Sequence, residues 1–331
     1  MRIIKRILLI LLIFSIFLGG IIGYLATRSL PLSNLPAAFT LDKGSSLSGV
    51  ALQLQKVGIF NNAIDRHVFI LVGRALNFST QIKSGRYQIN NTPSILELLQ
   101  LLNKGQVTEA QITIIEGWTF SQLRDVLNVH PDVRHDTLGM SNKAILQQLG
   151  LLESHAEGLF FPDTYYFTSG TSDLLILQQA QQTMQKHLNA TWAARAPNLP
   201  LKTPYQALIL ASIVEKETGQ ASDRAMIAGV FLNRLKIGMK LQTDPTVIYG
   251  IGAAFDGNLR RRDLLKDTPY NTYTRYGLPP TPIALPGLAA LQAVTQPAAT
   301  EALYFVARGD GSSAFSKFLR DHNNAVNRYQ K

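Results

Sequence analysis

Two glutamates that could act as acids, Glu215 and Glu217, stand near the end of a predicted helix that is otherwise apolar. A carboxylic acid held against apolar surface keeps its proton to higher pH, as a general acid must near neutral pH. Polar, aromatic and Pro-containing segments follow at 241–249 and 270–280. Loops of this composition beside a protonated acid are typical of a cleft that binds sugars. The sequence therefore favours chemistry on a glycan.

Most glycosidases use a pair of carboxylates, one as acid and one as nucleophile or base. Four residues are candidates in this chain: Glu217, Glu215, Asp244 and Asp163. On a helical wheel both glutamates flank apolar residues, so periodicity does not choose between them. Each candidate also has a structural interpretation, a solvated helix end for the glutamates and an Asx turn before Pro245 for Asp244.

The helix that carries the glutamates has recognisable ends in the sequence. Thr203 is predicted to cap it, and Pro204 suits the first helical position. Gln206 is expected to complete a capping box, and Gly219 is the expected stop. A second helix is predicted over 222–235, so the two form an αα-hairpin.

The preceding part of the chain mixes strand and helix patterns. A small α+β module is predicted over 39–115, in which Ser94 and Glu97 form a capping box. After it, a mainly helical region begins with a helix capped near Thr119. The predicted segments are strands at 39–44, 81–89 and 111–115, helices at 47–57, 69–76, 94–102 and 174–190, and an extended aromatic stretch at 157–167. The predicted fold class is therefore α+β.

The N-terminus has the composition of a membrane anchor. Residues 7–26 are uncharged and mostly apolar, and a helix of this length spans the hydrocarbon core of a bilayer. Positive charge, which tends to stay in the cytoplasm, precedes it at Arg2, Lys5 and Arg6. We therefore expect residues 1–6 inside, a single span in the cytoplasmic (inner) membrane, a linker over 27–38, and the rest on the outer or periplasmic face. A cleaved signal peptide is the alternative, but the segment lacks a small-x-small cleavage pattern.

Composition excludes several kinds of chemistry. The chain has no cysteine, so thiol catalysis, disulfides and Cys-based zinc sites are excluded. The six histidines show no metal-ligand spacing, and no serine-hydrolase or phosphate-loop motif occurs, so neither a metal nor a cofactor is expected. The formal net charge of +10 is scattered, without an aromatic-interleaved basic stripe. This pattern argues against nucleic acid and fits an anionic polymer or lipid headgroups better.

Several motifs, in their order along the chain, resemble the membrane-anchored endolytic murein transglycosylases of bacteria, the MltG or YceG-like family. They lie at 157–165, 211–217, 241–249, 270–273 with 277–280, and 304–307. The similarity covers nearly the whole chain, and several long motifs in order are far more specific than one short match. Thr281 and Leu285 depart from the Gly and Asn of the family's Pro-rich loop. These departures concern subsite detail and leave the reaction unaffected.

The resemblance implies a LysM-like module over 39–115 and a lysozyme-like, mainly helical catalytic domain over 116–331. It also implies cleavage of the MurNAc-β-1,4-GlcNAc bond within nascent peptidoglycan strands. In this family the second glutamate of the Glu-Lys-Glu triplet is catalytic, so Glu217 takes that role. The protonated acid would protonate the glycosidic oxygen, and the carboxylate would then take the proton of the C6 hydroxyl of the same MurNAc. The product would carry a 1,6-anhydro-MurNAc end.

The residues expected to position the glycan are polar members of the same motifs. They are Gln242, Thr243, Asn271 and Tyr273, with Asp244 and Asp163 as further candidates. The expected partners are glycan strands and the membrane, and the resemblance adds peptidoglycan synthases. Two alternatives stay open. One is a muramidase that uses water, with Asp244 as second carboxylate, and the other is a catalytically silent, membrane-tethered glycan-binding scaffold.

Overall fold

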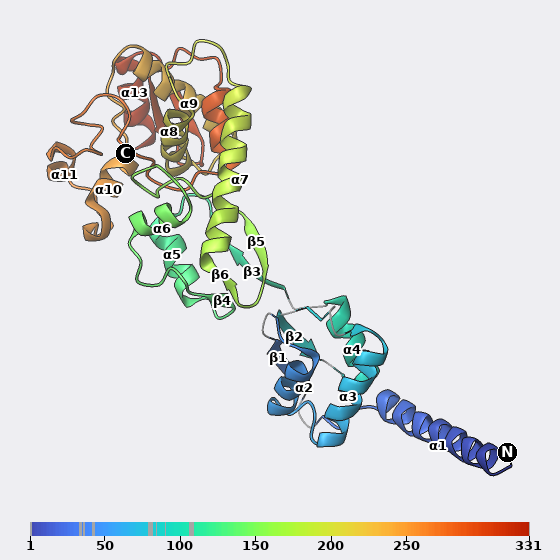
Figure 1. The fold of residues 1–331 in the computed structure, drawn as a ribbon. Coiled ribbons are helices and arrows are strands. Elements are labelled where there is room, and N and C mark those ends of the chain that lie inside the picture. The colour runs from blue at the N-terminus through green and yellow to red at the C-terminus, as the bar shows by residue number, and fades with distance from the viewer. Residues whose placement is uncertain are drawn as a thin grey trace. The chain divides into compact units, whose positions relative to one another are not determined.

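The chain forms two compact units, each described here by itself (Figure 1). Unit 1 comprises residues 1–110 with 166–171, and unit 2 comprises residues 111–165 with 172–331. The computed structural model describes residues 2–32, 35, 37–41, 44–78, 82–83, 85–89, 91–105 and 109–330, with the side chains of 2, 3 and 109 left out. Helices outweigh strands in both units, so the protein is mixed α and β with a helical majority.

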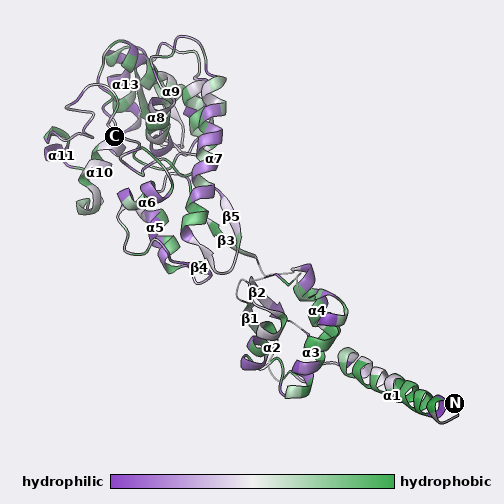
Figure 2. Cartoon of the chain, in the orientation of Figure 1, coloured by the Kyte–Doolittle hydropathy of each residue, from purple (hydrophilic) through white to green (hydrophobic). Residues whose placement is uncertain are grey.

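The first helix, α1 (Arg2–Thr27), is apolar along most of its length (Figure 2). Its stretch Ile4–Thr27 is long and apolar enough to cross a membrane, judged by length and composition alone. Large apolar side chains such as Ile10 and Phe17 are more than half exposed. A helix that is apolar on every face finds no matching environment in water.

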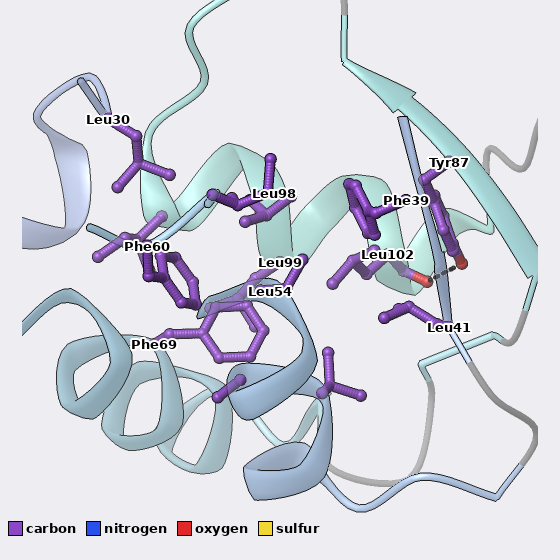
Figure 3. Close-up of a cluster of buried hydrophobic side chains, with 14 of the residues drawn as sticks. Leu30, Phe39, Leu41, Leu54, Phe60, Phe69, Tyr87, Leu98, Leu99 and Leu102 are labelled. Atoms are coloured by element: carbon purple, nitrogen blue, oxygen red, sulfur yellow. Dashed lines mark hydrogen bonds between the residues drawn. The ribbon is translucent and has the colours of Figure 1, made fainter. Parts of the chain in front are cut away.

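Unit 1 packs three helices against a two-stranded antiparallel sheet. Strand β1 (Ala37–Leu41) pairs with β2 (Gly85–Ile89), with Ala37 opposite Ile89. The helices are α2 (Leu47–Lys56), α3 (Ala63–Ala75) and α4 (Ile95–Lys104). Alternate residues of β2 are buried, as a strand with one covered face requires. Figure 3 shows the resulting core, in which the ring of Phe39 stacks on that of Tyr87 at 5.6 Å.

The local signals of unit 1 are partly confirmed. The predicted capping box is present, because Ser94 N donates to Glu97 Oε2 at 2.8 Å and Glu97 N donates to Ser94 Oγ at 3.2 Å. The helix predicted at 69–76 begins earlier, at Ala63, because the Asn62 side chain accepts from Asp65 N and caps it there. The strand predicted at 81–89 is observed only over 85–89, and residues 81 and 84 lie outside the described residues.

Residues 28–32, which belong to the predicted linker, lie on unit 1. Leu30 is buried in the core cluster, and its N–H donates to Pro93 O at 2.8 Å. Arg28 forms an ion pair with the buried Asp65 at 2.6 Å, and Ser29 makes an antiparallel bridge with Ser94. The end of α1 is therefore fixed to the module that follows it. Residues 33, 34 and 36 lie outside the described part.

Unit 2 is built mainly from helices. Of the short strands that follow, residues 109–110, 166–168 and 171 are grouped with unit 1. Strand β3 (Glu109–Thr113) pairs with β5 (Thr164–Thr168), β4 (Val133–Arg134) with β6 (Thr171–Ser172), and β7 (Tyr304–Ala307) with β8 (Ser313–Ser316). The helices are α5 (Phe120–Val129), α6 (Asn142–Gln148), α7 (Asp173–Ala193), α8 (Pro204–Glu217), α9 (Ala221–Lys236), α10 (Asp244–Ile251), the 3₁₀ turn η2 (Gly252–Ala254), α11 (Arg261–Leu265), α12 (Leu288–Thr295) and α13 (Leu319–Tyr329).

The central element of unit 2 is α8. Every residue from Ala207 to Val214 is buried, and α7, α9, α10 and α12 pack around it. A helix that is apolar all round must be enclosed in this way to hide its surface from water. Within this buried stretch Ser212 is polar, and its Oγ accepts from Ile283 N at 2.9 Å. The last turn of α8 carries the two glutamates.

Candidate active site

The C-terminal end of α8 is Glu217 itself. Thr203 caps the helix as predicted, accepting from Gln206 N at 3.2 Å, and Pro204 takes the first position. The predicted capping box is wrong, because Gln206 Oε1 accepts from Lys202 N and not from the cap residue. The predicted stop at Gly219 agrees with the observed end, because Thr218, with extended backbone, is the C-cap and Gly219 follows it directly. Gly219 does not, however, have the left-handed backbone of a typical glycine cap. Glu217 therefore stands at the rim of the helix, where its side chain can leave the core.

Glu217 is held by a threonine from the next part of the chain. Thr243, the N-cap of α10, donates its hydroxyl to Glu217 Oε1 at 2.5 Å. Thr243 is itself 1% exposed and fixed by two further threonines. Its N–H donates to Thr272 Oγ1 at 3.1 Å and its carbonyl accepts from Thr246 Oγ1 at 2.8 Å, while the Thr246 and Thr272 hydroxyls lie 2.9 Å apart. The donor to Glu217 is thus rigidly placed.

The surroundings of Glu217 raise its pKa above the usual range. Burial against apolar surface is the largest cause, and the nearby Asp244 carboxylate adds to it. The Thr243 hydroxyl and the positive charge of Arg234 act in the opposite direction but do not cancel the rise. A carboxyl group in this setting retains its proton closer to neutral pH.

Asp244 and Tyr273 form a second polar pair beside Glu217. The Tyr273 hydroxyl donates to Asp244 Oδ1 at 2.5 Å, and the Asp244 side chain is exposed. The pKa of Tyr273 is raised by its burial, by this hydrogen bond and by the charges of Asp244 and Glu217. The phenol therefore stays protonated at any ordinary pH.

Gln242, which directly precedes Thr243, faces outward. Its side chain is exposed, whereas that of Thr243 points inward to Glu217. Gln242 has a left-handed backbone with φ of 48°, which is unusual for a residue with a side chain. Its N–H donates to Thr272 O at 3.2 Å, which helps hold the segment in that conformation.

Asn271 is buried and organises the loop that precedes Tyr273. Its amide nitrogen donates to three carbonyls, of Asp263, Leu264 and Lys266, at 3.2, 3.1 and 2.7 Å. Its amide oxygen accepts from Tyr273 N at 2.8 Å. These contacts occupy the side chain, so the geometry favours a positioning role over direct contact with a ligand.

Glu215 points to a different neighbour. Its Oε2 accepts from Gly287 N at 2.9 Å, at the start of α12, where the positive end of the helix dipole favours a carboxylate. Burial raises its pKa, and the charge of Glu116 adds to the rise. Periodicity left the two glutamates equivalent, and the tertiary contacts separate them: Glu215 binds a helix start, whereas Glu217 joins the polar cluster.

Asp163 lies apart from this cluster in its contacts. Its side chain is exposed, with Oδ1 accepting from the adjacent Thr164 N at 2.7 Å, and its carbonyl accepts from Ile114 N at 2.9 Å. Among the described residues, no hydrogen bond or ion pair joins Asp163 to Glu217, Thr243 or Tyr273. The structure therefore does not bring this candidate together with the others.

Arg234 was not singled out from the sequence. This buried side chain on α9 donates from Nε to Leu303 O at 2.7 Å and from Nη1 to Leu241 O at 2.5 Å. Its guanidinium lies 5.5 Å from the centre of the Tyr304 ring. By holding the carbonyl of Leu241, it fixes the segment that leads to Gln242. An arginine at helical spacing in a basic chain carries no sequence signal for this role.

The sequence analysis also did not predict the contact between Glu157 and Tyr249. Glu157 Oε1 accepts from Phe120 N at 2.8 Å, and its Oε2 accepts from the Tyr249 hydroxyl at 3.0 Å. Burial raises the pKa of Glu157 to about 7. Next to it, Gly158 has φ of 80°, and an added Cβ would lie 2.5 Å from Pro282. Only glycine fits there without displacing that proline.

The described part of the chain holds no group of three or more His, Cys, Asp or Glu side chains arranged to bind a metal ion. The polar groups of the cluster are instead one buried carboxyl, one exposed carboxylate, a phenol and threonine hydroxyls. Such a set can donate a proton and form hydrogen bonds to the hydroxyl groups of a bound sugar.

Comparison with known proteins finds relatives that share one name. An endolytic murein transglycosylase of Bacillus subtilis (strain 168) is 30% identical over 306 residues, which are 87% of this chain and 83% of that protein. The enzyme of the same name from Streptococcus pneumoniae serotype 2 (strain D39) is 28% identical over an alignment of 347 positions, which covers 93% of this chain and 62% of that protein.

A solved structure and a family model agree with these relatives. The crystal structure of a YceG-like protein from Listeria monocytogenes superposes with a TM-score of 0.54 at 27% identity, covering 87% of this chain and 98% of that one. The sequence model of the YceG-like family matches residues 39–328. This match covers well over half of the chain, and the motifs around Glu217 and Thr243 lie within it. The chain belongs to the YceG-like family.

Proposed function

We propose that this protein is a membrane-anchored endolytic murein transglycosylase that cleaves peptidoglycan strands. The observation that carries the proposal is the Glu217 carboxyl, whose pKa burial raises and whose Oε1 the Thr243 hydroxyl engages at 2.5 Å. The names of the relatives from Bacillus subtilis and Streptococcus pneumoniae support the substrate class. Peptidoglycan is an anionic polymer, which suits a chain with a formal net charge of +10.

The two oxygens of Glu217 have separate tasks in the proposed reaction. Thr243 donates to Oε1, and no hydrogen bond from the described residues engages Oε2. Oε2 is therefore the oxygen that carries the proton and faces the glycosidic oxygen. As that proton is transferred, the bond between the leaving oxygen and C1 of MurNAc breaks, and positive charge develops on the sugar ring.

The carboxylate formed in this step then acts as a base. It takes the proton of the C6 hydroxyl of the same MurNAc, O6 forms a bond to C1, and Glu217 returns to its protonated state. The product end is a 1,6-anhydro-MurNAc. The attacking hydroxyl is already part of the substrate, so its effective concentration is high and no enzyme nucleophile is required.

In this proposal some neighbouring residues bind the sugar and others position the residues that do. Gln242, Asp244 and Tyr273 lie at the exposed side of the cluster and are proposed to bind sugar hydroxyls. Thr243 and Asn271 are proposed to act through others, one on Glu217 and one on the loop before Tyr273. Asp163 remains a prediction, and none of its contacts supports a role at this site.

One observation favours a second candidate reaction. Asp244 is exposed, and its charge raises the pKa of Glu217. The two carboxyl groups are therefore close enough to interact, as the acid and the second carboxylate of a glycosidase must be. In a muramidase Asp244 would activate water or stabilise the sugar cation. This reaction leaves a reducing end in place of the anhydro end, so the products distinguish the two.

The remaining features complete the proposal. Residues 1–6 would be cytoplasmic, 7–26 would span the inner membrane, and the units beyond would act on the outer or periplasmic face. The LysM-like character of the region 39–115 and the lysozyme-like character of 116–331 stay predictions. Peptidoglycan synthases stay the expected protein partners.

The test is mass spectrometry of the products that the full-length protein releases from purified peptidoglycan. The wild type should release anhydro-ended fragments, Glu217→Gln should release none, and Glu215→Gln, the matched control on the same helix, should retain the reaction. Hydrated reducing ends would identify a muramidase. Glycan binding without cleavage by a folded wild type would identify the scaffold and overturn the proposal.

A further inference from the structure

The last turn of α1 packs into the rest of unit 1. Ala26 in the last turn of α1 is 5% exposed and belongs to the same buried cluster as Leu30, with Leu25 packed against it. The elements of unit 1 that α1 contacts are α3 and α4. The ion pair between Arg28 and Asp65 closes the junction, and Asp65 is fully buried.

The position of Ala26 along the span sets the height of unit 1. A hydrocarbon core about 30 Å thick takes about 20 helical residues at 1.5 Å each. Counted from Ile7, the first residue after the charged Arg6, such a span ends near Ala26. The residue at which the span ends is therefore already inside the core of unit 1, so no free chain separates this unit from the bilayer surface.

Helix α3, which α1 contacts, carries large apolar side chains that are exposed. Ile64 and Leu71 are 60% and 50% exposed and lie seven residues apart, on one face of the helix. Asp65, which holds Arg28, follows Ile64 directly. The exposed Arg74 lies near Leu71 on the helix surface, so a cation borders the apolar pair.

We propose that the face of α3 formed by Ile64 and Leu71 lies in the headgroup region of the outer leaflet, next to the exit of α1. The proposal rests on the single-pass anchor of the proposed function. Exposed apolar side chains bordered by a cation are typical of helices that lie at a bilayer interface. Arg74 would meet lipid phosphates, and an anionic phospholipid would strengthen the contact. Unit 1 would then rest directly on the membrane surface and would not move freely on a flexible linker.

The absence of cysteine makes a site-specific test direct, because each introduced cysteine is the only one in the chain. The full-length variants Leu71→Cys, Thr40→Cys and Phe14→Cys would each be labelled with an environment-sensitive fluorophore. They would be placed in nanodiscs of phosphatidylcholine and phosphatidylglycerol. Lipids with a nitroxide near the headgroup or deep in the acyl chain would serve as quenchers. Thr40, an exposed residue on β1, is the matched control. In Figure 1, α2 and α3 lie between β1 and α1.

The expected result is a blue-shifted emission at Leu71 that the shallow nitroxide quenches more than the deep one. Emission at Thr40 should stay at its aqueous position and unquenched, and Phe14 should be quenched by the deep nitroxide. Loss of quenching at Leu71 with Phe14 still quenched would overturn the inference alone. A blue shift at Leu71 without quenching by any lipid would indicate a protein partner or a second copy, which also overturns it. No quenching at Phe14 would instead show that α1 does not span the bilayer, which contradicts the membrane anchor of the proposed function.

Discussion

The hydroxyl of Thr243 donates to Glu217 Oε1 at 2.5 Å and thereby joins the start of α10 to the end of α8. Two opposing effects meet in this carboxyl. Burial and the charge of Asp244 raise its pKa, whereas the Thr243 hydrogen bond and Arg234 lower it. The balance favours an acid that can give up its proton during the reaction and recover it afterwards, as the proposed two-step mechanism needs.

Replacing Thr243 by Val should raise the pKa of Glu217 further. The hydrogen bond that stabilises the carboxylate is lost, so the proton is held more strongly and the alkaline limb of the pH–rate profile moves to higher pH. The rate should fall on the order of tenfold, because a misplaced acid loses about 1.4 kcal/mol of transition-state stabilisation. Thr243→Ser keeps the hydroxyl and should restore both the limb and most of the rate. An unchanged limb in Thr243→Val would contradict the assignment.

Replacing Asp244 by Asn should move the same limb in the opposite direction. The negative charge of Asp244 disfavours ionisation of Glu217, so its removal lowers the pKa of Glu217 and the alkaline limb shifts to lower pH. The Asn side-chain oxygen can still accept from Tyr273, which keeps the local geometry. The measurement is release of soluble fragments from peptidoglycan against pH. Complete loss of turnover with a normal fold would instead favour the muramidase.

Gln242 offers a test that separates backbone strain from ligand contact. Its φ of 48° costs energy in any residue with a Cβ but little in glycine. Both Gln242→Ala and Gln242→Gly should lose activity on the order of tenfold if the amide binds sugar. Gln242→Gly should be the more stable of the two by about 1 kcal/mol. Wild-type turnover in both variants would remove Gln242 from the ligand set.

Glu215 should matter for stability more than for chemistry. Its carboxylate binds Gly287 N at the start of α12, so Glu215→Ala should lower the free energy of unfolding of unit 2 by about 1.5–3 kcal/mol, the range for a hydrogen bond to a charged group. The two tryptophans, Trp118 and Trp192, both lie in unit 2 and report its unfolding in urea. Turnover of the folded fraction should stay within a few-fold of the wild type. A loss as large as that of Glu217→Gln would assign Glu215 to catalysis.

Glu157 should make the stability of unit 2 depend on pH. Its pKa is about 7 in the folded protein against 4.5 in a free side chain. Between these pH values Glu157 is protonated in the folded state but ionised in the unfolded state. Its contribution to the free energy of unfolding is therefore fully present below pH 4.5 and is lost as the pH rises toward about 7. The loss is on the order of 3 kcal/mol for a shift of this size.

The control for this prediction is Glu157→Gln, which removes the titrating group but keeps an acceptor for Phe120 N. Its unfolding free energy, followed by tryptophan fluorescence, should lose most of that slope over the same pH range. A slope equal to that of the wild type would assign the pH dependence to other groups.

The outlines of several elements were predictable because their signals are local. The caps at Thr203 and at Ser94 with Glu97, and the apolar run of α8, depend on contacts within a few residues of the chain. A local signal misled at Gln206, where a competing bond from Lys202 N occupies the side-chain oxygen. The cap at Asn62, which starts α3 before the predicted position, is also a local signal, and the apolar pattern alone did not include it.

The sequence by itself determined that an apolar helix must be buried with carboxylates at its end, and its motifs were enough to indicate the family. Only the tertiary structure decided what each carboxylate does. Glu217 meets Thr243 across 26 residues, Glu215 meets Gly287 across 72, and Glu157 meets Tyr249 across 92. A pKa depends on the apolar surface and charges that packing brings near a group, and helical periodicity holds no information about partners so far along the chain.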